Sequence, residues 1–131
     1  MFNTILFPVN RSREARQAAD VAIEMVKKYQ ARLVVLSVVE PAEGEDANAA
    51  SAEATELLNK VKATLQEVGI AAELKLAQGK PAFAICDVAD EVGADLIIIG
   101  SRGMSLTDEH PEGSVSQKVI NLSPCPVLVV P

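Results

Sequence analysis

The chain has 131 residues, of which 49% are apolar and only 3% aromatic, and its formal net charge is −6. This length fits one domain, residues 1–131, and the scarcity of aromatic residues predicts a core of aliphatic side chains, typical of sheets covered on both faces. The negative charge disfavours nucleic acid and anionic membranes as partners, and no run of membrane-spanning length or signal peptide is recognisable, so we expect a cytoplasmic protein.

The first third of the chain alternates strand and helix patterns. The run Thr4 to Val9 predicts a strand that finishes near Pro8, which cannot donate to a ladder, and Asn10 to Ser12 predict a loop. From Ser12, a suitable N-cap, small and apolar residues recur at helical spacing. The apolar run Arg32 to Val39 predicts the second strand.

The middle of the chain contains an amphipathic helix and a weaker strand. Residues 42–50 are acidic, rich in alanine and without a period, which predicts a mobile connection. Ser51 leads into a helix that Gly69 ends, with apolar positions at Ala54, Leu57, Leu58, Val61, Leu65 and Val68. The run Ile70 to Ala77 alternates weakly and predicts an edge strand with one face toward solvent.

The last third completes the alternation. Pro81 opens a helix that Gly93 ends, and the buried run Leu96 to Ile99 predicts a strand that stops at Gly100. A glycine-containing loop, a short helix from Ser114 to Leu122 and a final strand from Pro126 to Val130 follow.

Strands that alternate with helices imply right-handed crossovers and an open, five-stranded parallel sheet with helices on both faces. In such α/β sheets the ligand lies at the carboxyl ends of the strands where the winding direction switches. We therefore expect the loop Pro8 to Ser12 and the loop Gly100 to Gly113 to share one site.

The second of these loops has the chemistry of an anion site. Ser114 and Gln117 have the spacing of a capping box, which starts the last helix beside the loop and turns free N–H groups toward it. The hydroxyls of Ser114 and Ser116 add further hydrogen-bond donors for a phosphate. The loop matches neither the P-loop nor the G-x-G-x-x-G fingerprint.

The spacing of Gly100-x2-Gly103-x9-Gly113-Ser114 resembles the glycine motif of the universal stress protein family. The segments I-L-F-P-V-N, V-L-S-V-V-E, G-K-P-A, A-D-L-I-I-I-G-S-R-G and S-P-C-P-V-L-V-V-P extend the resemblance over the whole chain. It implies an adenine nucleotide alpha-hydrolase-like fold with the strand order 3-2-1-4-5, a homodimer, and ATP binding at these loops. The last strand, Val127 to Val130, would pair across the dimer, although a loop could also cover that edge.

The resemblance also assigns the site residues. It implies that Pro8, Val9 and Val38 flank the adenine, and that the ribose and phosphates are lined by Gly100, Arg102, Gly103, Gly113, Ser114, Val115 and Ser116. Asn10 stands where members that bind ATP carry an aspartate for the ribose hydroxyls. An asparagine keeps one acceptor oxygen but loses the charge, so we expect weaker binding.

Several other polar residues leave alternatives open. Asp108, Glu109 and Glu112 either hold Mg²⁺ against a phosphate, repel the anion, or are solvated loop residues. We interpret His110 as a solvated side chain, and Cys86 and Cys125 as small residues in or near the core.

The sequence contains no recognisable catalytic constellation, which favours a binding module over an efficient enzyme. The main hypothesis is a dimeric stress or signalling module whose affinity for an unidentified protein partner changes when an adenine nucleotide orders residues 101–112. The alternatives are a dimeric interaction protein that has lost nucleotide binding, and a slow ATPase.

Overall fold

The computed structural model describes residues 1–10, 15–40, 47–100 and 115–131. The predicted site residues Arg102, Gly103, Gly113 and Ser114 lie outside these ranges, as do Ser12, the three acidic residues of the glycine loop and His110. In chain order the elements are β1 (Thr4–Pro8), α1 (Ala15–Tyr29), β2 (Arg32–Val39), α2 (Ala47–Glu67), β3 (Glu73–Gln78), α3 (Pro81–Val92), β4 (Leu96–Gly100), α4 (Val115–Leu122) and β5 (Val127–Val130).

The five strands form one parallel sheet in the order β3-β2-β1-β4-β5, which confirms the predicted fold class and strand order. The central strand β1 pairs with β2 from Thr4↔Arg32 to Pro8↔Leu36 and with β4 at Ile5↔Leu96 and Leu6↔Ile97. Because β1 lies between strands that follow it on opposite sides, the winding direction reverses there.

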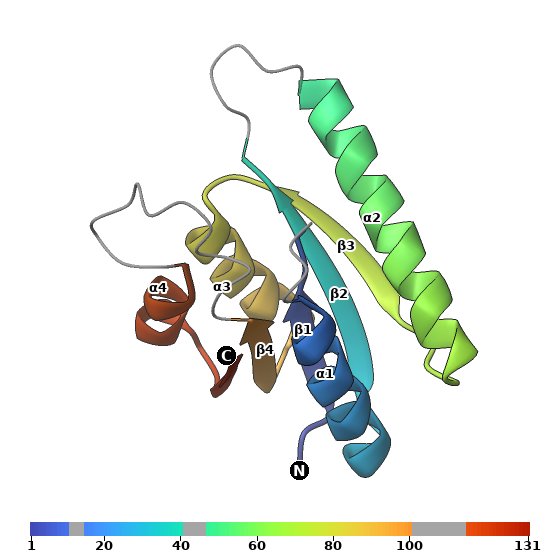
Figure 1. Cartoon of the computed structure of the whole chain (residues 1–131). Helices are drawn as coiled ribbons and strands as arrows, with labels where there is room; N and C mark the ends of the chain where they lie inside the picture. The colour runs from blue at the N-terminus through green and yellow to red at the C-terminus, as the bar shows by residue number, and fades with distance from the viewer. Residues whose placement is uncertain (11–14, 41–46, 101–114) are drawn as a thin grey trace.

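Helices cover both faces of the sheet, and alternate strand residues point to each (Figure 1). Residues Ile5, Phe7 and Ile98 face α1 and α2. Residues Leu6 and Ile97, one position along, face α3 and α4. Both faces are therefore dry, which explains why the central strands are continuous aliphatic runs.

Single residues determine where α3 begins and where it ends. Pro81 lies in its first turn, where the missing N–H has no partner to lose. Gly93 ends the helix in the left-handed conformation, with φ 68°, and its N–H caps the carbonyl of Asp90. Both predicted boundaries are confirmed.

The predicted start and end of α2 need correction. The helix begins at Ala47, four residues before Ser51, because the alanine-rich segment has high helix propensity even without an apolar period. At the other end, Val68 is 39% exposed rather than facing inward, since the helix ends at Glu67 and the chain turns at Gly69, φ 84°. Ile70, 5% exposed, enters the core instead.

The edge strand β3 is confirmed as an edge, but the prediction of one solvent face is wrong. Leu76 is 39% exposed, whereas Lys75 is half-buried and its Nζ lies 2.6 Å from Oε1 of Glu91 in α3. The strand also begins at Glu73 rather than Ile70. The reason is that helices approach both faces of β3, so neither face is simply polar or apolar.

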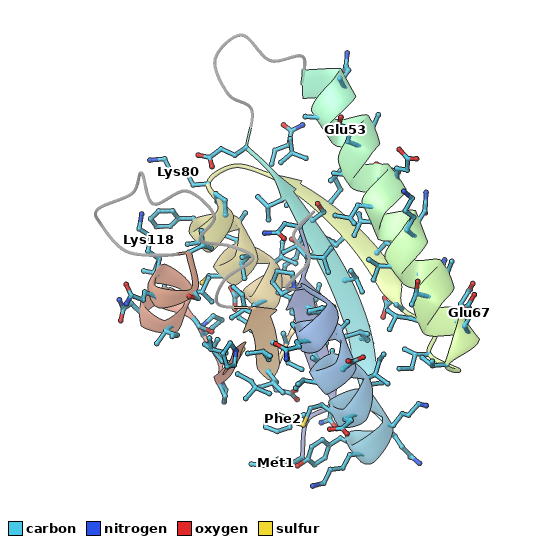
Figure 2. All side chains as sticks on the ribbon, in the orientation of Figure 1. Met1, Phe2, Glu53, Glu67, Lys80 and Lys118 are labelled. Carbon is cyan, nitrogen blue, oxygen red and sulfur yellow. The ribbon has the colours of Figure 1, made fainter. Side chains whose placement is uncertain are left out.

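Hydrogen bonds and an ion pair link the strands at the amino end of the sheet. The Asp95 carboxylate, just before β4, accepts hydrogen bonds from the backbone N–H groups of Asn3 (2.9 Å) and Thr4 (3.1 Å). Arg32 at the start of β2 makes a two-point ion pair with Glu73 at the start of β3, and its Nη2 lies 3.0 Å from Oε1. Phe2, labelled in Figure 2 beside the N-terminus, stacks edge-to-face on Tyr29 with ring centroids 5.2 Å apart.

Candidate functional site at the carboxyl ends of the strands

The site begins where β1 ends, beside the last residues of β2. Pro8 closes the β1 ladder opposite Leu36, and the N–H of the following Val9 still donates to the Leu36 carbonyl at 2.8 Å. The chain therefore runs along β2 for one more residue before it leaves the sheet at Asn10. This places Val9 and Asn10 directly beside the last residues of β2.

A pocket of about 210 Å³ opens above these strand ends, between them and the N-terminal half of α2. It is far larger than one water, whose share of liquid volume is about 30 Å³, but smaller than most complete ligand sites, at about 300–1,000 Å³. The lining residues are Val9, Asn10, Ser37, Val38, Val39, Glu40, Ala50, Glu53, Ala54 and Leu57. This volume fits one portion of a ligand rather than a whole nucleotide.

The pocket brings together three of the predicted site residues: Val9, Asn10 and Val38. Pro8 is buried as the last residue of β1 but does not line the pocket. Their contact with a ligand stays a prediction.

Sequence reasoning missed the polar residues that β2 and α2 contribute to the pocket. Ser37 lies within the strand run Arg32 to Val39 and Glu53 within the helix that follows, and neither pattern by itself predicts a site residue. Figure 2 shows Glu53 near the N-terminal end of α2, and the pocket lining places it opposite the strand ends. A polar residue inside an otherwise apolar strand was the available signal for Ser37.

The pocket has a buried floor and an open rim. Val9, Ser37 and Val39 are each 5% exposed and form the floor, while Glu40 and Glu53 are exposed. The residues that line the pocket include two carboxylates and no lysine or arginine. The pocket therefore suits an uncharged group with an apolar body and hydrogen-bonding edges, and it disfavours a phosphate.

The second half of the predicted site lies at the end of β4. Gly100 is buried and pairs with Val130 of β5. Among the residues that the structure describes, a Cβ built on Gly100 would meet only the Cβ of Ala18, at the ordinary contact distance of 3.8 Å. On α4, Ser116 is 4% exposed and Val115 packs against the core. Packing against the described part of the chain therefore does not require glycine at position 100.

The two cysteines are free, with Cys86 buried and Cys125 half-buried, as expected from the sequence. Burial raises the pKa of the Cys86 thiol, with a smaller contribution from Asp87, and burial also raises the pKa of Cys125. Raised pKa values keep both thiols protonated near neutral pH, which fits a packing role. In the described part of the chain, no group of three or more His, Cys, Asp or Glu side chains is placed to hold a metal ion.

The open parallel sheet has helices on both faces and a pocket at its carboxyl edge, beside the switch in winding direction. These features define a doubly wound α/β protein with a candidate site at its strand ends. The model of the Universal stress protein family matches residues 1–131. The chain belongs to this family, which confirms the resemblance seen in its sequence.

Individual relatives agree with this membership. Universal stress protein Sll1654 of Synechocystis is 51% identical over 136 residues, covering 100% of this chain and 87% of the relative. Among solved structures, protein MJ0577 is 30% identical with a TM-score of 0.86, covering 99% of this chain and 96% of the other. A universal stress protein from Archaeoglobus fulgidus, solved in complex with dAMP, is 25% identical with a TM-score of 0.81 and covers 98% of each chain. None of the helices in the described ranges is long and apolar enough to cross a membrane.

Proposed function

We propose that this protein is a cytoplasmic adenine nucleotide-binding module of the stress response that acts as a homodimer. The observation that carries the proposal is the pocket at the carboxyl ends of β1 and β2, with an apolar wall, a polar rim and no cationic side chain among its lining residues. These properties suit a base and a sugar. The relative solved with dAMP gives independent support for an adenine nucleotide as the ligand.

In this proposal the two halves of the site divide the ligand between them. Val9 and Val38 flank the adenine beside Pro8, and Asn10 meets the ribose through its side-chain oxygen. The phosphates extend away from the carboxylates of the rim, toward the end of β4 and the start of α4. Gly100, Val115 and Ser116 would receive them together with Arg102, Gly103, Gly113 and Ser114.

Calorimetric titration of the purified protein with ATP, ADP and AMP, each with and without Mg²⁺, tests this function. We expect saturable binding, weakened or abolished in a Gly113→Val variant that unfolds at the same temperature. A dependence on Mg²⁺ that disappears when Asp108, Glu109 and Glu112 are changed to asparagine or glutamine would assign the metal to that loop. No heat and no thermal shift at millimolar nucleotide would refute the proposal.

The dimer rests on the edge strand β5. Its four residues, Val127 to Val130, are all half-buried at the outer side of the sheet, which leaves an apolar edge available for pairing. Sedimentation equilibrium measures the assembly directly. A monomer at all concentrations would contradict a dimer through this edge.

The exposed carboxylates of Glu40 and Glu53, together with the uncharged Asn10, favour a second candidate: a dimeric interaction protein without a nucleotide. The two candidates differ in the effect of Gly113→Val on capture of a protein partner. Loss of capture in a folded variant supports nucleotide control, whereas unchanged capture supports the interaction protein. Phosphate release during incubation with ATP, absent in the same variant, would identify slow hydrolysis.

A further inference from the structure

Helix α3 carries an exposed aromatic side chain. The chain has three Phe residues and one Tyr, and Phe83 is 53% exposed, whereas Phe7 is buried and Phe2 stacks on Tyr29. On the neighbouring helix α4, which lies beside α3 in Figure 1, Ile120 is 52% exposed. Large apolar side chains exposed on adjacent helices are a feature of interaction surfaces.

Charged residues flank Phe83 on the same side of α3. Lys80 lies directly before the helix, three residues before Phe83, and Asp87 lies four residues after it, a spacing that places all three on one face. Both charged residues are exposed, and Figure 2 shows Lys80 at the N-terminal end of α3. Neither makes an ion pair with any residue that the structure describes. Along the helix, this surface is therefore cationic, then aromatic, then anionic.

The charges of α3 are arranged against its own dipole. Anions are favourable near the N-terminus of a helix and cations near the C-terminus. In α3 a lysine precedes the N-terminus, and Asp90 and Glu91 lie in the last turn, which has no basic residue. Glu91 is compensated by Lys75, whose Nζ lies 2.6 Å from its Oε1. The charge order therefore does not stabilise α3 itself, but it is complementary to a helix that runs in the opposite direction.

A second copy of α3 in antiparallel orientation has this complementary charge order. A two-fold axis at Phe83 would bring the two Phe83 rings together and place Lys80 of each copy beside Asp87 of the other, because these residues lie about 4.5 and 6 Å from Phe83 along the helix axis. We propose that the α3 surface, formed by Lys80, Phe83 and Asp87, is a self-association surface whose partner is a second copy of this chain.

The α3 surface is separate from the edge strand β5, and it requires no nucleotide, so the inference goes beyond the proposed function. Chains that also pair through β5 would be joined by α3 into assemblies larger than a dimer. Because the ion pairs are exposed, the association is weak and decreases with salt. Sedimentation equilibrium at low salt and high protein concentration measures it.

Charge reversal tests the antiparallel arrangement. Lys80→Glu and Asp87→Lys each place like charges opposite one another twice in a symmetric pair, so each should weaken self-association about tenfold. A 1:1 mixture of the two variants should associate about as well as the wild type. In the mixed pair, one copy carries two acidic groups and the other carries two basic groups at the facing positions.

Matched controls separate this contact from general effects of charge and hydrophobicity. Glu56→Lys makes the same change in charge as Asp87→Lys on an exposed position of α2, which covers the other face of the sheet, and its mixture with Lys80→Glu should not restore association. Phe83→Ser should weaken association about tenfold. Val68→Ser, at an apolar side chain that is 39% exposed after α2, should leave it unchanged.

The midpoint of urea unfolding, measured at low protein concentration, should be the same for the wild type and the charge variants, since those side chains are exposed. The mixing experiment therefore decides the inference even if Phe83→Ser is less stable. Failure of Lys80→Glu and Asp87→Lys to recover association when mixed would overturn it, as would equal association of the wild type and Phe83→Ser. A dimer that persists unchanged in all of these variants is the one formed through β5, so the two surfaces are distinguished.

Discussion

The two ends of the sheet are built differently, although the same five strands form both. At the amino end, the Asp95 carboxylate accepts hydrogen bonds from the backbone of β1, and Arg32 pairs with Glu73 between neighbouring strands. At the carboxyl end, β1 and β2 open into a pocket with exposed carboxylates on its rim and the buried Ser37 on its floor. The amino end is closed by its own residues, whereas the carboxyl end leaves groups for a ligand.

This difference follows from parallel topology. In chain order every helix follows a strand of the parallel sheet, so the helix N-termini, with their positive dipole ends, lie toward the carboxyl end of the sheet. The amino end receives helix C-termini instead, such as that of α3 at Gly93. Substitutions at the amino end should therefore change stability alone, and substitutions at the carboxyl end should change binding alone.

The largest expected effect comes from Asp95→Ala. The change leaves the N–H groups of Asn3 and Thr4 without their carboxylate, and should lower the free energy of unfolding by about 2 kcal/mol. Urea denaturation with an unchanged m value measures it. Asp87→Ala, an exposed aspartate of α3, is the matched control and should stay within about 0.5 kcal/mol of the wild type. Weaker nucleotide binding by folded Asp95→Ala would break the distinction between the two ends.

The fold was predictable because both faces of the sheet are buried. Continuous aliphatic runs such as Arg32–Val39 and Leu96–Gly100 cannot be solvated strands, and their alternation with helices determines a parallel sheet. The predictions of the start of α2 and of the exposure of Leu76 were wrong, because the spacing of apolar residues carries no information on either. The start of α2 at Ala47 depends on alanine propensity, and the exposure of Leu76 depends on where neighbouring helices stop covering the edge.

Gly100 lies at the carboxyl end of the sheet and Gly93 at the amino end, so their alanine variants test the difference between the two ends. Gly100→Ala adds a methyl group that meets only Ala18 within the described ranges, so the free energy of unfolding should change by no more than about 0.5 kcal/mol. If the backbone there approaches a phosphate, nucleotide affinity should nevertheless fall by about tenfold, or 1.4 kcal/mol. Titration and urea unfolding of the same sample give both numbers.

The matched variant is Gly93→Ala at the amino end. Its φ of 68° is unfavourable for a residue with a Cβ, so the free energy of unfolding should fall by about 1 kcal/mol while affinity stays unchanged. Unchanged affinity in Gly100→Ala would remove Gly100 from the site. A loss of affinity in Gly93→Ala would show instead that the two ends are coupled.

The site was less predictable than the fold, for a reason that Ser37 and Glu53 illustrate. Val9 and Asn10 directly follow β1 at the switch in winding direction, and topology alone brings that position to the candidate site. Ser37 lies inside a strand, and Glu53 lies on a helix whose angle to the sheet no local pattern specifies. Their meeting in one pocket depends on how α2 packs, which is a tertiary property.

The smallest effect concerns the ion pair of Arg32 and Glu73, which is exposed to solvent and contributes little. The hydrogen bond from Arg32 lowers the pKa of Glu73 below its ordinary value of 4.5. A lowered pKa in the folded state means that the contribution of the ion pair to stability is complete above pH 4.5 and is lost as the pH falls through the lowered value.

The wild type should therefore have a slightly higher melting temperature than Glu73→Gln at neutral pH. The difference should vanish in acid and in 1 M salt, where the Debye length is about 3 Å. Thermal melts of both proteins across this range measure the difference, and nucleotide affinity should be equal in the two. A difference in melting temperature that survives full protonation of the carboxyl would mean that Glu73 acts through packing rather than charge.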